Sequence, residues 1–491
     1  MIGRRSGSAS AKFCSRRFKV IARRQGRFRH ERRKRKEEFV AIGSNGTIAE
    51  TGILGRRKTA PVVDATKAAF FWLAAFFFVY CARPGDWIPG FKYAPLAKIT
   101  AILAMWGLFS SLGRTKRTFK DLPKEGRYLL AMIGLLYVSG FLSPIWKGGA
   151  VSRTIDISKV FVAWALTFLL ITTFDRLRRI IFIQAASVVV ICIVSIIKGH
   201  NQPRLEGVLG GIYSNPNDLA FAIVLSLPFA LAFFVTAKSI FAKVLWVSGM
   251  LCMMAALFLT ASRAGFIDLI ICGSVALWHF GIRGRRFYLI VGTGLLGVVL
   301  AATVGGKLYD RFSALSGESS TEQSAYGSYE DRKYLMLRAI NGIEHYPVLG
   351  VGVNNFVTYS GIWHEVHMTY LQICVEGGIP ALILYLMFFG RGFKNLRVLL
   401  KTKNLDADIV LFVGALHSSL IGFVVGALFA PEAYQFFPYF AVAFTATLLQ
   451  IVREREREAQ PGPASPPPKK PRHFLETYAD YGRTGAVTPV R

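Results

Sequence analysis

The chain has 491 residues, of which 53% are hydrophobic and 13% aromatic. A soluble globule of this composition would carry more apolar surface than it could bury, which excludes an ordinary soluble protein and predicts one solvated by lipid. The formal net charge of +31 would favour nucleic acid as the partner of a soluble protein. Here Lys and Arg concentrate in the two tails and in alternate short loops, which predicts membrane lipids and no nucleic acid as partners.

The first and last segments are predicted to be tails outside the membrane. Residues 1–65 are basic and lack the apolar core and cleavage site of a signal peptide, so we expect a disordered cytoplasmic tail. Residues 453–491 begin with alternating charges and continue with many prolines, which predicts a short helical extension and then a disordered, Pro-rich segment. The six cysteines lie far apart without a CxxC pair, so neither disulfides nor a thiolate metal site is predicted, and no cofactor is expected.

Apolar stretches follow the first tail, each long enough to cross about 30 Å of hydrocarbon as a helix. They predict an all-α polytopic membrane protein of about twelve transmembrane helices, nine within residues 66–304 and three within 369–452. The expected spans are 66–82, 95–112, 127–145, 157–174, 178–197, 217–237, 242–260, 264–281, 287–304, 369–390, 408–429 and 433–451.

The short loops alternate between cation-rich and cation-poor, which sets the orientation because Lys and Arg remain in the cytoplasm. This predicts an inner-membrane protein with both termini in the cytoplasm. Residues 305–368 then form one large periplasmic loop. Within it we expect a flexible acidic and Ser-rich stretch, 317–329, and a surface helix over 332–346 that Ser328 caps and Pro347 stops.

Three arginines on the predicted outer side oppose this charge bias: Arg204, Arg263 and Arg332. An Arg close to hydrocarbon needs an aqueous cavity or an anionic partner, and its planar fork of donors suits phosphate oxygens. Alternatively, each could extend to lipid headgroups or pair with a carboxylate such as Asp268 or Glu206.

Polar residues at the start of two predicted spans are further candidates. Asn215, Asn217 and Asp218 open the sixth span, where Asn217 or Asp218 could cap the helix or contact substrate. His364 and His367 precede the tenth span. Either histidine could act as a general base, the pair could bind a metal, or they could be plain interfacial residues. We favour a base without a metal.

Gly350, Gly352 and His417 are not assigned to the site. Gly350 and Gly352 make up only half of a nucleotide-binding fingerprint, so a tight turn is expected there. His417, within the eleventh span, could be a core histidine or a relay, and the sequence does not decide between them.

Four groups of residues then occur in order between Gly199 and Ala381. They are Arg204 followed by Ser214–Ala220; Thr260–Gly265; Arg332-x-x-Leu335-Met336-x-x-Ala339-Ile340 leading to His345–Gly352; and His367-x-x-Tyr370-Leu371 with Glu376–Pro380. In this order and spacing they resemble the O-antigen ligase and O-antigen polymerase superfamily. The family usually has Asn directly after the histidine, where this chain has Met368.

The resemblance implies a GT-C-like helical fold and a metal-independent, inverting glycosyl transfer. The donor would be an undecaprenyl-diphosphate-linked glycan, and the acceptor a hydroxyl of a glycan, lipid or protein on the periplasmic face. The catalytic roles fall on His367 as base and on Arg332 and Arg263 at the diphosphate. Substrate contacts are expected from Arg204, Asn215, Asn217, Arg338 and His364.

Other functions fit parts of the sequence. A transporter or flippase for lipid-linked oligosaccharides could also have a dozen spans and outer arginines, but no internal repeat is evident. A membrane anchor that recruits partners would explain the tails and leave the outer motifs unexplained. Within the enzyme class, ligation to a lipid A core, polymerisation of repeat units and transfer to protein stay open.

Overall fold

The computed structural model describes residues 65–88, 90–91, 94–111, 115–199, 204–207, 213, 215–313, 322–362 and 364–459. They all belong to one structural unit, Asp64–Arg491, and all regular elements among them are helices. These are α2 (Lys67–Ala82), α3 (Pro84–Trp87), α4 (Leu96–Ser110), η1 (Phe119–Asp121), α5 (Lys124–Phe141), α6 (Lys147–Leu170), α7 (Phe174–Gly199), α8 (Pro216–Thr236), α9 (Ile240–Thr260), α10 (Arg263–Leu277), η2 (Trp278–Ile282), α11 (Phe287–Ser313), α12 (Glu322–His345), α13 (Phe356–Ser360), α14 (Thr369–Lys401), α15 (Ala407–Gly426) and α16 (Phe436–Ala459).

Seven of these helical segments are long and apolar enough to cross a membrane: α7, α8, α9, α10 with η2, α14, α15 and α16. Three shorter apolar helices are α2, α4 and the Phe287–Val299 part of α11. The predicted all-helical, multi-pass architecture is therefore confirmed, and each predicted span overlaps a described helix. The count of twelve spans and the GT-C-like fold stay predictions. Of the predicted tails, 1–65 and 453–491, residues 1–64 and 460–491 lie outside the described residues.

Two helices begin earlier than the sequence predicts. Helix α6 starts at Lys147, ten residues before the expected span, because polar residues at a membrane surface continue a helix without adding to its hydropathy. Helix α12 starts at Glu322, so the predicted N-cap Ser328 lies inside a helix, and the expected flexible stretch is helical over 322–329. Both predictions were wrong because they used the apolar periodicity, which a helix at the membrane surface does not require along its whole length. The end of α12 before Pro347 is confirmed.

Helix α14 is interrupted in its first half, at Gly378, and a loop docks at the interruption. Gly378 has φ +80° and Pro380 has no N–H, so the carbonyls of Val375 and Glu376 lose their helical donors. The N–H groups of Val351 and Gly352 take their place, at 2.8 and 3.0 Å. This loop therefore docks on α14 by the hydrogen bonds that the broken helix lacks.

Glycine is required on both sides of this contact. A Cβ at Gly350 (φ +67°) would lie 2.5 Å from the carbonyl carbon of Glu376, and one at Gly378 would lie 2.2 Å from the Val348 oxygen. The turn expected at Gly350–Gly352 is thus confirmed. Above it, α12 and α13 pack on α14 around a small separate core of Leu335, Ala339, Val351, Phe356, Val366 and Val375.

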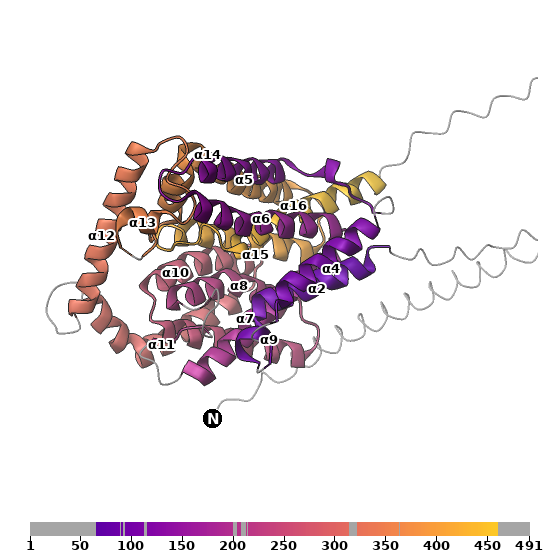
Figure 1. Cartoon of the computed structure of the whole chain (residues 1–491). Coiled ribbons are helices and arrows are strands. Elements are labelled where there is room, and N and C mark those ends of the chain that lie inside the picture. Colours follow the sequence, from indigo (N-terminus) through magenta and orange to yellow (C-terminus); the bar gives the residue numbers. More distant parts are fainter. Residues whose placement is uncertain are drawn as a thin grey trace, which may run out of the picture. The chain divides into compact units, whose positions relative to one another are not determined.

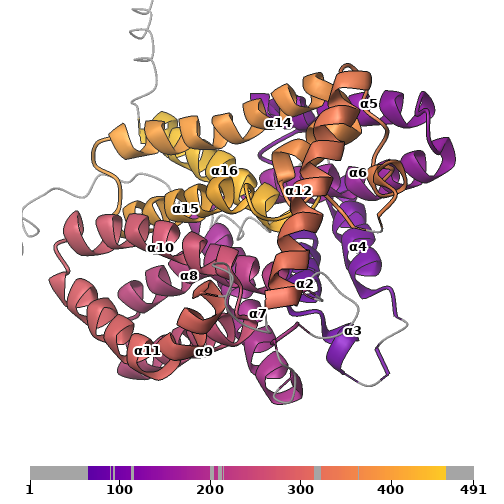
Figure 2. The same ribbon diagram turned by 90° about the vertical axis from the view of Figure 1, so that its left-hand side faces the viewer.

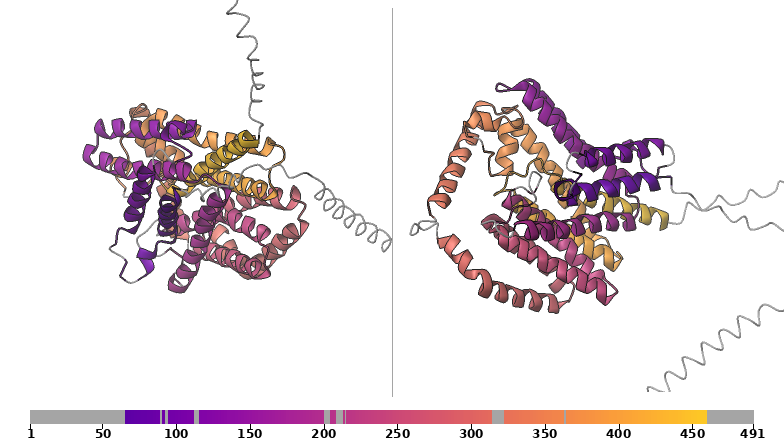
Figure 3. Two further views of the ribbon diagram at one scale, coloured as in Figure 1. Left: turned by 90° about the vertical axis from the view of Figure 1, so that its right-hand side faces the viewer. Right: turned by 60° about the horizontal axis from the view of Figure 1, so that its bottom comes forward.

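This core fixes α12 across the ends of other helices. Helix α12 runs transversely to α14, α15 and α10 in two perpendicular views (Figures 1 and 2). The start of α2 and the end of α16 lie on the opposite side of Figure 1. Helices α11 and α12 follow one another along the outer edge of the unit (Figure 3, right). The long predicted loop therefore forms a surface helix over one end of the bundle.

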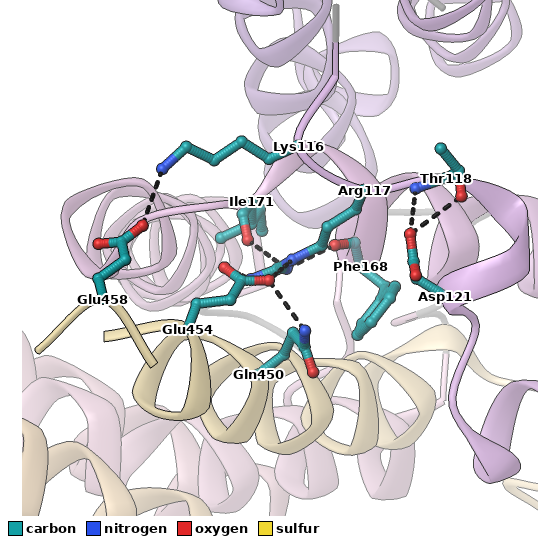
Figure 4. Close-up of polar contacts among 9 residues, drawn as sticks. All are labelled: Lys116, Arg117, Thr118, Asp121, Phe168, Ile171, Gln450, Glu454 and Glu458. Carbon is teal, nitrogen blue, oxygen red and sulfur yellow. Dashed lines mark hydrogen bonds and ion pairs between the residues drawn. The ribbon is translucent and has the colours of Figure 1, made fainter. Parts of the chain in front are cut away.

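At the other end, one buried arginine joins three elements. The Arg117 side chain is 1% exposed, and its guanidinium bonds Glu454 of α16 (2.9 Å) and the carbonyls of Phe168 and Ile171 at the end of α6 (2.8 Å each; Figure 4). Those carbonyls have no helical donor because α6 ends at Leu170. Arg117 therefore satisfies a helix end and an acid together.

Arg117→Met should destabilise the protein by about 2 to 3 kcal/mol, because it removes the cation that pairs with Glu454 and leaves two carbonyls without a donor. Thermal unfolding of the purified protein in detergent measures the effect as a lower midpoint. Arg455→Met is the matched control, since Arg455 pairs with Asp406 at 3.0 Å with both side chains at least half exposed, and such pairs contribute little. Equal midpoints for the two variants would contradict the assigned role of Arg117.

Candidate functional site

The end of the bundle beneath α12 contains a cavity of about 350 Å³. Its lining includes five of the eight predicted site residues, from three separate parts of the chain: Arg204, Asn215, Asn217, Arg332 and His367, together with Glu206 and Pro216. Arg263 is not part of this lining, but its charge lowers the pKa of Arg332, which is. The structure thus brings together residues that are more than 160 positions apart in the sequence.

The start of α8 places two asparagines in different roles. The Asn215 side chain accepts a hydrogen bond from the Asn217 N–H (2.9 Å), which makes Asn215 the N-cap, and Pro216 is the first helical residue. The Oδ1 of Asn217 instead accepts from the Ser262 hydroxyl at 2.7 Å and from Arg204 at 3.4 Å. The expectation that Asn217 or Asp218 caps this helix was wrong by two or three residues, and Asn217 links α8 to α10.

Arg204 is held at the end of α9. Its Nε donates to the Thr260 carbonyl at 3.1 Å, and the Leu205 N–H donates to the Leu259 carbonyl at 2.9 Å. Both acceptors belong to the last turn of α9, whose carbonyls lack helical donors. Arg204 therefore completes a helix end while it lines the cavity.

Arg263 and Arg332 bring two positive charges close together. Arg263 is the first residue of α10, directly after the N-cap Ser262. Burial, and then the charge of Arg263, lower the pKa of Arg332. The Nε of Arg332 is buried and has no hydrogen-bond partner in the described part of the chain.

No carboxylate of the described residues forms an ion pair with either arginine. Pairing of Arg263 with Asp268, the alternative considered from sequence, is contradicted, since both Asp268 oxygens are buried without partners. Glu206 is the acid that lines the cavity. Two close guanidinium groups without a paired acid favour the binding of an anion.

His367 lies beside these arginines in the segment between α13 and α14. Burial first, then the charges of Arg332 and His364, lower the pKa of His367 to about 4. Its imidazole is therefore neutral at pH 7, with a lone pair able to accept a proton. Its neighbour Val366 is buried in the small core under α12, which fixes the segment.

The remaining predicted residues lie outside this lining. Arg338 donates to the Tyr359 carbonyl at 3.0 Å and stacks over the Tyr359 ring at 5.0 Å, so its visible contacts are structural. His364 is exposed. His417 lies 2.8 Å from His279, ring nitrogen to ring nitrogen, between α15 and η2.

A second cavity, of about 290 Å³, was not predicted. Arg153, Asp156, Asn354, Glu365, Gln372 and Gln435 are among the residues that line it. Arg153 could have been found from the sequence, because it is a further cation on the predicted outer side. Gln372 carried none, since nothing in the sequence distinguishes it from an ordinary polar residue in a helix.

The middle of the chain matches a known family. Residues 248–386 match the O-antigen ligase family model. This segment includes Arg263, Arg332, His364 and His367, and it confirms the resemblance inferred from the sequence. Together with the apolar helices, the match supports a membrane protein of the O-antigen ligase or polymerase type.

The other comparisons add little. No curated protein matches the chain. One solved structure, titled "Structural coordination of polymerization and crosslinking by a peptidoglycan synthase complex", contains a chain that aligns with 69% of this chain and 98% of its own length, at 16% identity and a TM-score of 0.37. A likeness at that TM-score carries no argument about fold or function.

The position of His367 leads to a titration prediction. Arg332→Gln removes a positive charge that opposes protonation, so the pKa of His367 should rise from about 4 toward its ordinary value. The ¹³Cε1 shift of His367, assigned with a His367→Gln variant, follows this titration by NMR. Lys333→Gln, which removes an exposed charge from the same helix, should leave the pKa unchanged. An equal rise in both variants would show that Arg332 does not face His367.

Proposed function

We propose that the protein transfers an undecaprenyl-diphosphate-linked glycan to an acceptor hydroxyl on the periplasmic face of a bacterial inner membrane. The observation that carries the proposal is the convergence of Arg263 and Arg332, without a paired acid, beside the neutral His367. These three residues lie within the segment that matches O-antigen ligases. The position of α12 opposite the start of α2 and the end of α16 (Figure 1) fits a topology with both termini in the cytoplasm.

The arginines bind the leaving diphosphate. Displacement at the anomeric carbon forms a bond from the acceptor oxygen to that carbon and breaks the bond to the diphosphate oxygen, which leaves with the electron pair. The configuration inverts because the acceptor attacks opposite the leaving group. Arg332 and Arg263 supply the positive charge that stabilises the departing anion, while Arg204 and Asn217 line its cavity. The proposal assigns this charge to guanidinium groups and includes no metal.

His367 takes the proton of the acceptor hydroxyl. A base with a pKa near 4 is unprotonated but weak, and the ideal base has a pKa near the working pH. The bound diphosphate corrects this mismatch, because its negative charges offset those of Arg332 and raise the pKa of His367. The base therefore becomes effective only when the donor is in place. The acceptor can belong to a glycan, a lipid or a protein.

Arg332→Lys and Arg263→Lys should each lose most transfer activity although the charge is kept, because an ammonium cannot make the two-pronged contact with a phosphate. The assay follows transfer by purified protein reconstituted with the undecaprenyl-diphosphate glycan and separate candidate acceptors, and identifies the acceptor that gains mass. Arg455→Lys, at an exposed ion pair of α16, is the control. Wild-type rates for both site variants would show that these arginines serve packing or topology.

His367→Ala should reduce turnover by about 10² to 10⁴ and leave donor binding nearly unchanged, because it removes a general base and no phosphate contact. His364→Ala should have a much milder effect, since that side chain is exposed outside the cavity. EDTA should not change the wild-type rate. A dead His364→Ala variant, or loss of activity in EDTA, would instead support a metal site at the two histidines. Donor movement across liposomes without any transfer would support the flippase alternative.

A further inference from the structure

The second cavity lies beside the first. Glu365 lines one and His367 the other, two residues apart in the same segment. Asn217 lines the first cavity, and its neighbour Asp218 interacts electrostatically with Glu432, which follows Pro431 of the second lining. A ligand in the second cavity would therefore lie next to the proposed base.

Gln372 is the clearest sign that this cavity binds a ligand. Its residue is 3% exposed, and its Oε1 is buried without a hydrogen-bond partner. Its amide nitrogen faces the Glu365 carboxylate at 3.5 Å. A buried amide oxygen without a partner costs free energy that a bound hydrogen-bond donor would recover.

The lining suits hydroxyl groups better than a second anion. The carboxylates of Asp156 and Glu365 outnumber the one cation of the lining, Arg153, and would repel a phosphate. Amides of Gln372 and Gln435 both donate and accept, as vicinal hydroxyls require. Tyr434 and Phe436 add aromatic side chains to the same lining, and such side chains can pack on the apolar C–H groups of a sugar.

We propose that this cavity is a saccharide-binding subsite that holds a sugar ring of the glycans being joined next to His367. The proposal rests on the proposed glycosyl transfer, because it identifies the chemical class of the neighbouring substrate. Arg153 and Glu365 bind hydroxyls at its entrance, and Gln372 binds one at its base. The two possible sources of the ring, the donor glycan and an acceptor glycan, share this chemistry.

Binding without transfer tests the subsite. Purified full-length protein in nanodiscs is titrated with two lipid-free probes, the glycan released from the undecaprenyl-diphosphate donor by mild acid and a deacylated lipid A-core oligosaccharide. Isothermal calorimetry gives the Kd of each. Gln372→Leu should weaken binding by about 3- to 10-fold, the equivalent of one hydrogen bond. The probe that binds identifies the source of the sugar ring.

Gln184→Leu is the matched control, because Gln184 of α7 is also buried, at 2% exposure, with an unpartnered Oε1, but it lies outside the second lining. It should keep wild-type affinity. Gln435→Leu, at a half-buried position of the same cavity, provides a second test if Gln372→Leu does not fold. Wild-type affinity in both cavity variants, or no binding of either probe to the wild type, would overturn the subsite.

Inorganic diphosphate separates this proposal from the proposed function. Its binding should be lost in Arg332→Lys and unaffected in Gln372→Leu. If neither arginine contributes to diphosphate binding while Gln372 still contributes to glycan binding, the transfer mechanism fails and the subsite stands. If Arg332→Lys loses diphosphate binding while Gln372→Leu keeps wild-type glycan binding, the mechanism is retained and the subsite is overturned.

Discussion

The hydrogen bonds between the broken part of α14 and the turn at Val351–Gly352 hold the candidate site together. Pro380 and Gly378 free two carbonyls of a membrane helix, and an unpaired carbonyl at that depth is costly. The turn supplies their donors, and two hydroxyls hold it in place: Ser139 of α5 donates to the Leu349 carbonyl, and Ser143, just after α5, donates to the Val351 carbonyl. The break is therefore an attachment point, because it fixes the loop that carries α12 and His367 over the ends of the helices.

Arg263 and Arg332 form no ion pair with a described carboxylate, so their positive charge is left for a bound anion. At the other end of the bundle, the buried Arg117 is fully paired, because an acid and two carbonyls surround its guanidinium. Under α12 the opposite holds, because Arg263 lowers the pKa of Arg332, and Arg332 in turn lowers the pKa of His367. A protein gains nothing in stability from such an arrangement. An anionic substrate binds more tightly because of these unpaired charges. In the proposed mechanism the bound substrate also raises the pKa of His367.

The sequence predicted the individual residues of the first cavity better than their roles. Outer-side arginines stand out because the topology of membrane proteins disfavours them, and His367 stands out as a titratable group before a span. Asn215 and Asn217 were both expected at the substrate, yet the fold uses Asn215 as a cap and Asn217 as a link to Ser262. Arg338 has the same charge as Arg332 but packs on Tyr359, because six residues along a helix place it on a different part of the surface.

By itself, the sequence determined the helical class, the order of the apolar segments, the resemblance to O-antigen ligases and the turn at Gly350–Gly352. These features depend on local hydropathy, charge bias and backbone freedom, which are written in short stretches of residues. Only the tertiary structure decided which outer residues share a cavity, that Asp268 does not pair with Arg263, and that Gln372 has an unpartnered oxygen beside Glu365. The helices that carry these residues, α6, α8, α12 and α14, are far apart in the chain, and no local pattern specifies the distance between them.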